Sequence, residues 1–175
     1  MIIRPIVIFI ATMASLATSI GCGTGGSFVG NRFEDKQVDY KVGQPGAGWQ
    51  RVQLENNNVS WFNESVGAGL LVNSYCEGVA DAPLEGLTGE LLIGTTEREI
   101  LEQSVRPWSG REAMETVAVA RLDGVQRKRS MFVLKKDGCV YDVIYDAPIA
   151  RYDAGYSGYE RVRDGFDVGP RRDRR

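Results

Sequence analysis

The sequence contains no histidine among its 175 residues. Histidine is the commonest general acid–base residue and a favoured ligand of zinc and copper. Its absence excludes Ser-His-Asp and Cys-His nucleophile arrangements and every histidine-based zinc site. Catalysis would have to rely on carboxylates or lysines. We therefore expect a protein that is not an enzyme and that binds neither a metal nor another cofactor.

Cysteine and net positive charge are also scarce. The three cysteines include no Cys-x-x-Cys redox pair, and without histidine they make a poor metal site. The formal net charge is −2, whereas nucleic-acid binders usually carry a strongly basic field that neutralises phosphates. We therefore expect no nucleic-acid partner. The one dense basic run, four arginines in residues 171–175, is predicted to be a solvated tail, with contact to an anionic surface as the alternative.

A hydrophobic run long enough to span a membrane is missing as well. Residues 5–20 are uncharged, but this stretch is shorter than the ~20 predominantly apolar residues of a membrane helix. Hydroxyl side chains such as Thr12 and Ser15 interrupt it. One positive charge at Arg4, a short apolar core and a small-residue exit are typical of a secretory signal. Residues 1–21 are therefore predicted to be an export signal.

The exit of this signal, Ser19-Ile20-Gly21-Cys22, resembles the lipobox of bacterial lipoproteins. In that family the cysteine receives diacylglycerol and becomes the first residue of the mature protein. The resemblance implies lipid attachment at Cys22 and anchoring to a membrane of the cell envelope. Because Gly23 rather than aspartate follows the cysteine, it implies the outer membrane more than the inner. Ser19 departs from the usual leucine, so ordinary signal cleavage after Ser19 stays an alternative.

The chain beyond the signal has the composition of one globular domain. Residues 22–37 begin with a glycine-rich stretch and are predicted to be a lipidated tether. Residues 38–167 are predicted to form a single α+β domain, and residues 168–175 a basic C-terminal tail. Cys76 and Cys139 each border an apolar, strand-like run. They are expected to form a disulfide in an oxidising compartment or, alternatively, to be two buried thiols.

Hydrophobic periodicity predicts the order of elements inside the domain. Alternating apolar residues indicate strands between residues 38 and 76, and leucines at helical spacing indicate a helix after Pro83. A capping-box pattern at residues 96–99 predicts a second helix that ends at Pro107. Asp-Gly pairs at residues 123–124 and 137–138 predict a meander of three strands. Runs of strands separated by helices favour an antiparallel α+β sandwich over a parallel sheet.

Two groups of polar side chains are candidate sites. Tyr152, Tyr156 and Tyr159 recur at helical intervals near the C-terminus. They are expected to pack into the core or, alternatively, to form a partner-binding surface. Three glutamates within residues 97–102 would support carboxylate catalysis only if they converged across a cleft. On the predicted capped helix we expect them to form a solvated face instead.

The arrangement from residue 38 to 167 resembles the PsbP-like fold. The resemblance rests on Pro45 before Gly48-Trp49, the mid-chain helix, Gly110, the run Lys136-Asp-Gly-Cys-Val-Tyr141 and the closing helix to Phe166. Members of this fold are accessory, assembly or binding proteins. The resemblance therefore implies an antiparallel sheet between helices and a non-enzymatic role in binding or assembling another envelope protein. A small-ligand-binding envelope domain is the alternative.

Overall fold

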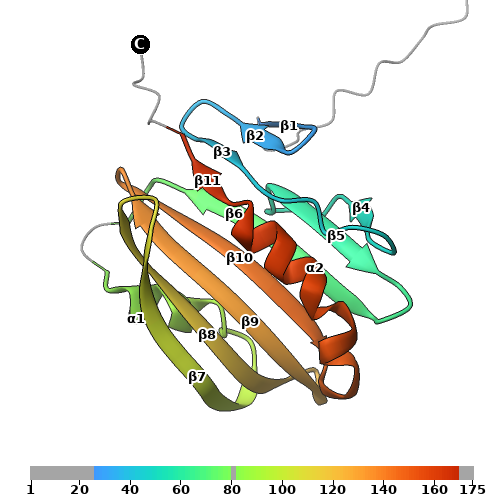
Figure 1. Cartoon of the computed structure of the whole chain (residues 1–175). Helices are drawn as coiled ribbons and strands as arrows, with labels where there is room; N and C mark the ends of the chain where they lie inside the picture. The colour runs from blue at the N-terminus through green and yellow to red at the C-terminus, as the bar shows by residue number, and fades with distance from the viewer. Residues whose placement is uncertain (1–25, 80–81, 170–175) are drawn as a thin grey trace, which may run out of the picture.

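The computed structural model describes residues 26–79 and 82–169, which form two antiparallel sheets and two α-helices (Figure 1). The small sheet has the order β1-β2-β3-β11. Its strands are β1 (Ser27–Val29), β2 (Arg32–Glu34), β3 (Asp39–Lys41) and β11 (Asp167–Val168). The large sheet has the order β4-β5-β6-β10-β9-β8-β7. Its strands are β4 (Gln50–Val52), β5 (Val59–Asn63), β6 (Ala68–Tyr75), β7 (Thr96–Trp108), β8 (Arg111–Leu122), β9 (Val125–Lys136) and β10 (Cys139–Pro148). The predicted antiparallel α+β class is confirmed.

The helices cover opposite faces of the large sheet. Helix α1 (Leu84–Glu90) packs on β8 and β9, whereas α2 (Tyr152–Asp164) follows the 3₁₀ turn η1 (Ile149–Arg151) and packs on β10 and β6. Figure 1 shows α2 crossing β10 on the near face. Successive side chains of a strand point to opposite faces. Accordingly, Val140 lies in the apolar cluster below α1, and Tyr141 lies in the main core on the α2 side.

The predicted three-strand meander corresponds to β8, β9 and β10. Both Asp-Gly turns have positive φ at their two central residues: 50° and 79° at Asp123 and Gly124, and 53° and 74° at Asp137 and Gly138. These are the dihedrals of a type I′ hairpin, which aspartate and glycine tolerate better than other residues. The turns therefore fix the register in which the long strands pair, such as Val143 with Phe132.

Glycines in α2 allow the helix to approach its neighbours closely. A Cβ atom on Gly155 would lie 2.6 Å from the Tyr145 hydroxyl, and one on Gly158 would lie 2.5 Å from the Trp49 indole nitrogen. The Tyr145 hydroxyl is buried and donates a hydrogen bond of 2.6 Å to the Tyr152 carbonyl. The two glycines lower intrinsic helix propensity, but tight packing on the sheet requires them.

The second predicted helix is wrong, because Thr96–Trp108 is the edge strand β7 of the large sheet. Its pairing with β8 has register shifts between Thr96 and Glu99 and between Ile100 and Glu102. Such bulges break the two-residue alternation of a strand, and here they leave apolar residues at a spacing that resembles a helix. Pro107 belongs to the strand, a position that an edge strand tolerates.

The predicted boundaries of the tether and of the tail also change. Within residues 22–37, the segment from Ser27 to Glu34 forms the β1–β2 hairpin. The Phe33 side chain in this hairpin is 2% exposed and stacks on Tyr40 with ring centroids 5.1 Å apart. At the other end, Val168 is buried in β11. The domain therefore includes residues 27–34 and 168, and the short strands escaped detection because each spans only two or three residues.

A buried carboxyl–amide pair lies in the centre of the large sheet. Asp142 on β10 is 2% exposed and accepts a hydrogen bond of 2.8 Å from Asn73 Nδ2 on β6. Burial raises the pKa of Asp142 from 3.8 to about 6, and the bond from Asn73 opposes this shift. Among the described residues, Asn73 Oδ1 has no hydrogen-bond partner. A protonated Asp142 could donate to that oxygen and satisfy both groups.

We predict that ionisation of Asp142 contributes a loss of stability as the pH rises from about 4 to about 6, and that Asp142→Asn abolishes this component. Because the folded-state pKa is raised, the folded chain binds the proton more tightly than the unfolded chain does. The contribution of Asp142 to the free energy of unfolding is therefore larger below pH 4 than above pH 6, by about 3 kcal/mol for a pKa raised from 3.8 to about 6. The amide introduced by Asp142→Asn would keep both hydrogen bonds without titrating.

Denaturant unfolding at pH 4 and at pH 7.5 measures this difference. Asp142→Asn should be more stable than wild type at pH 7.5 and close to it at pH 4. The other carboxylates titrate in both proteins and cancel in the comparison. A difference between the two proteins that does not change with pH would contradict the assignment.

Candidate functional site

An open cleft of about 820 Å³ lies between the β1–β2 hairpin and the loop that joins β4 to β5. Gly26, Phe28 and Phe33 line it from the small sheet, and Arg51 and residues 52–58 line it from the large sheet. Its volume falls within the ~300–1,000 Å³ typical of ligand sites. The wall of the cleft combines aromatic and charged side chains.

Arg51 is a charged residue in the wall of this site, and we call the site the Arg51 cleft. Its guanidinium carbon lies 4.9 Å from the Phe28 ring centroid and 5.2 Å from that of Trp61. The two rings contact edge to face at 5.8 Å. Arg51 Nη1 donates a hydrogen bond of 2.8 Å to the Ser60 carbonyl. The aromatic rings therefore hold the guanidinium in place while most of its donors remain available.

Partial burial lowers the pKa of Arg51, because desolvation penalises the charged guanidinium. A carboxylate or a row of carbonyl oxygens from a bound molecule would offset that penalty with charge-assisted hydrogen bonds. Glu55 also lines the cleft, so the wall carries both signs of charge. This chemistry suits a polar peptide surface.

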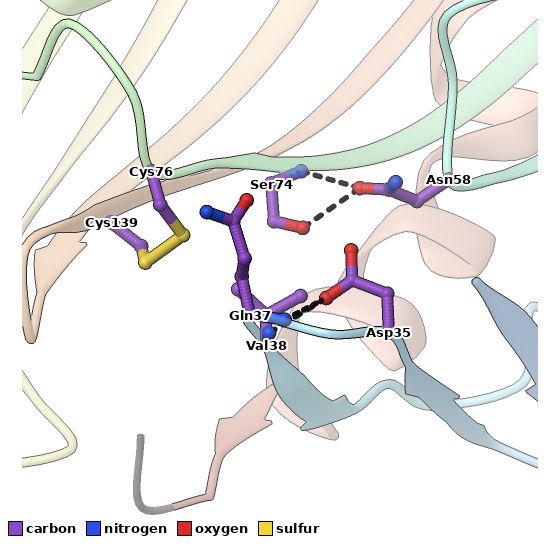
Figure 2. The surroundings of a disulfide bond; sticks show 7 residues. All are labelled: Asp35, Gln37, Val38, Asn58, Ser74, Cys76 and Cys139. Carbon is purple, nitrogen blue, oxygen red and sulfur yellow. Dashed lines mark hydrogen bonds between the residues drawn. A yellow bond between two sulfur atoms is a disulfide. The ribbon is translucent and has the colours of Figure 1, made fainter. Parts of the chain in front are cut away.

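Asn58 holds the β4–β5 loop, which lines the cleft, in place. Asn58 Oδ1 accepts hydrogen bonds from the Ser74 amide at 2.5 Å and from the Ser74 hydroxyl at 2.9 Å (Figure 2). Asn56 adopts a positive φ of 64°, which lets the chain turn before β5. Asn58 therefore holds the loop against β6, while Leu54 at the rim stays 46% exposed.

A disulfide joins Cys76 and Cys139 close to this loop (Figure 2). Cys76 follows β6 and Cys139 begins β10, and the neighbouring residues Tyr75 and Val140 pair across the two strands. The bond closes a loop with a sequence separation of 63 residues. It links the two halves of the large sheet and leaves Cys22 as the one cysteine outside the pair. Cys22 itself lies outside the described residues.

The tyrosines proposed as an alternative partner surface belong mainly to the core. Tyr152 is 5% exposed and Tyr159 is 2% exposed, so neither can contact a partner. Both rings pack on Tyr145, at 5.2 and 6.1 Å between centroids, and Tyr156 bridges them from a half-buried position. A partner surface made of all three residues is therefore wrong.

The described residues offer no second site with obvious chemistry. Residues 26–79 and 82–169 contain no group of three or more His, Cys, Asp or Glu side chains placed to hold a metal ion. The glutamates at residues 97–102 lie exposed on β7 and do not converge on the Arg51 cleft. In the same ranges, no helix combines the length and the apolar character that crossing a bilayer would need.

The Arg51 cleft was not predicted from the sequence. Phe28, Arg51 and Trp61 come from three strands, and only the register of β4 with β5, which pairs Arg51 with Trp61, brings the last two together. Phe28 lies in the segment predicted to be tether. The sequence feature within the cleft that stands out is the run Asn56-Asn57-Asn58, and this pattern indicates a turn rather than a binding site.

Comparison with known proteins shows the fold. The chain matches cyanobacterial PsbP (CyanoP) from Synechocystis sp. PCC 6803 with a TM-score of 0.55 at 15% identity, over 88% of this chain and 99% of that one. It matches LpqN, involved in cell envelope biogenesis of Mycobacterium tuberculosis, with a TM-score of 0.59 at 12% identity, over 75% and 83% of the two chains. PA94 from Pseudomonas aeruginosa, a protein of unknown function, gives a TM-score of 0.52 at 9% identity, over 70% and 82%.

These similarities establish the PsbP-like fold expected from the sequence. No protein-family model matches the sequence. No curated protein matches it either. At such low identities the shared fold carries no information about individual site residues.

We predict that removing the disulfide destabilises the domain without unfolding it completely. By the chain-entropy estimate, a loop of this length contributes about 4 kcal/mol, through constraint of the unfolded chain. The double variant Cys76→Ser/Cys139→Ser should therefore unfold at a lower denaturant concentration than wild type. Reductant should lower the midpoint of wild type to a similar value and leave the variant unchanged. Equal midpoints for oxidised and reduced wild type would contradict this prediction.

Proposed function

We propose that the chain is a lipid-anchored protein of the cell envelope that binds another envelope protein and has no catalytic activity of its own. The observation that carries the proposal is the pairing of the cysteines. A disulfide between Cys76 and Cys139 suits an oxidising compartment outside the cytoplasm. It leaves Cys22 without a cysteine partner in the chain, at the position where the lipobox pattern places the lipid.

The start of β1 supports attachment close to the bilayer. Only residues 23–26 separate Cys22 from Ser27, the first residue of the domain. Five residue steps span at most ~18 Å when fully extended. Two or more acyl chains on Cys22 would hold this end of the domain at the membrane surface. Gly26 and Phe28 line the Arg51 cleft, so a partner in the cleft would also lie near the membrane.

The composition of the cleft supports a protein partner. Aromatic residues and arginine are enriched among the side chains that dominate protein–protein binding energies. Arg51 between Phe28 and Trp61 has this character, and Leu54 adds an exposed apolar contact at the rim. The fold supports the same role, because LpqN is described as involved in cell envelope biogenesis.

A small ligand is the second candidate, and the volume of the Arg51 cleft favours it. Native mass spectrometry of the protein released gently from membranes distinguishes the two. A discrete added mass that disappears in Arg51→Ala would support the ligand. Its absence, together with a protein adduct at the cleft, would support the protein partner.

We predict that Cys22 carries the lipid. Cells grown with an alkyne-tagged palmitate analogue should label the wild-type protein and should not label Cys22→Ser. The double variant Cys76→Ser/Cys139→Ser is the matched control and should retain the label, because the lipid requires only the cysteine of the signal. Label on Cys22→Ser, or an exported wild type without label, would contradict the anchoring.

We predict that the Arg51 cleft contacts the partner. A photo-crosslinking residue at Asn57 should give an adduct of discrete mass in cells, because this position lines the cleft. The same residue at Gln126, near the β8–β9 turn at the far end of the sheet, should give none. Leu54→Glu should weaken the adduct without lowering the melting temperature. Equal adducts at both positions would contradict the assignment.

A further inference from the structure

Strand β7 forms one edge of the large sheet. It is the last strand in the order β4-β5-β6-β10-β9-β8-β7, and in the described part of the chain no strand pairs with its outer side (Figure 1). All of its residues except Arg106 and Trp108 are exposed. An exposed edge strand carries backbone groups that are able to pair with another chain. The residues of β7 determine which chain that is.

Two observations show which backbone groups of β7 point outward. The turn Ser109-Gly110 has positive φ of 47° and 75°, as in a two-residue type I′ hairpin, and Trp108 pairs with Arg111 across it. The residues that flank such a turn exchange hydrogen bonds, so bonding to β8 alternates along β7 from Trp108. Pro107 has no N–H and falls at a position that does not bond to β8. Every second residue before Pro107 therefore directs its N–H and C=O outward.

The outward groups belong to a regular segment that is complementary to itself. From Glu102 onward, β7 pairs with β8 without a register shift. In an antiparallel pair with a second copy, centred on Ser104, Gln103 and Val105 exchange backbone hydrogen bonds with Val105 and Gln103 of the second copy. The same register places Glu102 of each copy opposite Arg106 of the other. Opposite charges in directly facing positions stabilise a strand pair.

The Arg106 guanidinium is already held in place within its own chain. Its carbon lies 4.6 Å from the Trp108 ring centroid, and Nη2 donates a hydrogen bond of 2.8 Å to Glu115. The side chain nevertheless remains 36% exposed. Among the described residues, its buried Nε has no hydrogen-bond partner. Arg106 therefore keeps donors for a second carboxylate, and ordering it in a pair costs little additional entropy.

Apolar side chains add to the same contact. Val105 is 49% exposed and lies on the face of β7 opposite to Arg106, where the two copies of Val105 become diagonal neighbours. Ile100 and Leu101 are 47% and 44% exposed and come directly before the regular segment. In this register they lie at the level of Pro107 and beyond in the second copy. Burial of this apolar surface favours association.

Features at both ends of the segment keep the pairing short. The register shift between Ile100 and Glu102 disturbs the edge on one side, and Pro107 removes a donor on the other. A two-fold pair uses the same edge of both copies, so it closes on itself instead of growing into a fibre.

We propose that two copies of this chain associate through β7 and form a dimer with one continuous antiparallel sheet. The Arg51 cleft includes β4 at the opposite edge of the large sheet. The dimer therefore leaves both clefts open, and it forms whether or not they bind a partner. Because interfaces below ~1,200 Å² are usually weak, we expect a Kd on the order of 10–100 µM.

Cysteine crosslinking tests the register. The protein used is the chain from residue 22, which contains every described element, with Cys22→Ser to remove the lipid site and its thiol. Ser104→Cys places a thiol on the two-fold axis, opposite its own copy at a non-hydrogen-bonded position, where Cα atoms lie ~4.5 Å apart. Mild oxidation should give a covalent dimer. Thr96→Cys is exposed on the same strand but far from its copy in this register, and it should give little.

Charge reversal tests the contact without a crosslink. Sedimentation velocity over about 5–500 µM protein measures the dimer. Glu102→Lys faces Arg106 with a like charge and should weaken association about 10-fold or more. Glu64→Lys makes the same change in net charge in the β5–β6 turn and should leave association unchanged. Both glutamates are exposed, so neither variant should lower the melting temperature.

A wild-type protein that stays monomeric throughout this range would overturn the proposal. Equal crosslinking of Ser104→Cys and Thr96→Cys, or a dimer that Glu102→Lys leaves intact, would also overturn it. A dimer with the expected variants, but with no adduct at Asn57 in cells, would refute the proposed partner of the Arg51 cleft and leave the pairing of β7 standing.

Discussion

The pairing of β6 with β10 is the interaction on which the rest of the domain depends. It joins strands from the two halves of the chain, with Val72 opposite Val143 and both side chains fully buried. The disulfide closes one end of this pair, and the Asn73–Asp142 bond crosses it on the face that α1 covers. Helix α2 packs on the opposite face, where Gly155 allows it to approach Tyr145. Without this pairing, the meander of β8 to β10 would have no strand partner from the first half of the chain.

The same architecture gathers the Arg51 cleft and the proposed anchor at one end of the molecule. The loop of the Arg51 cleft is held to β6 through Asn58 and Ser74, next to the disulfide. The small sheet forms the other wall of the cleft and carries both the first and the last described strand. A partner in the cleft and a lipid at Cys22 would therefore both meet the domain on this side. Such clustering suits a protein that acts at a membrane surface.

Sequence patterns predicted the parts of the fold that local chemistry determines. The Asp-Gly turns specify type I′ hairpins, so the meander was recovered with its boundaries nearly correct. The edge strand β7 was mistaken for a helix because two bulges disturb its alternation. The β1–β2 hairpin was missed because its strands are too short to show a period, and its burial depends on contacts such as Phe33 with Tyr40.

The candidate site was less predictable than the fold. The Arg51 cleft depends on three strands from two sheets, and no local pattern reports such a juxtaposition. The helical spacing of the tyrosines correctly indicated a helix. Whether Tyr152 faces solvent or the core is decided by how α2 docks on β10. The number of cysteines was more informative than the tyrosine spacing, because disulfide formation depends on the redox state of the compartment. It does not depend on how one helix docks on the sheet.

The central claim is that a lipid on Cys22 holds this compact binding domain at a membrane. Intact mass spectrometry of the protein extracted from membranes with detergent tests it most directly. The account predicts that the chain begins at Cys22 and carries the added mass of a diacylglycerol, with or without a further acyl group. A mature chain that begins at another residue, or one whose Cys22 is an unmodified thiol, would contradict it.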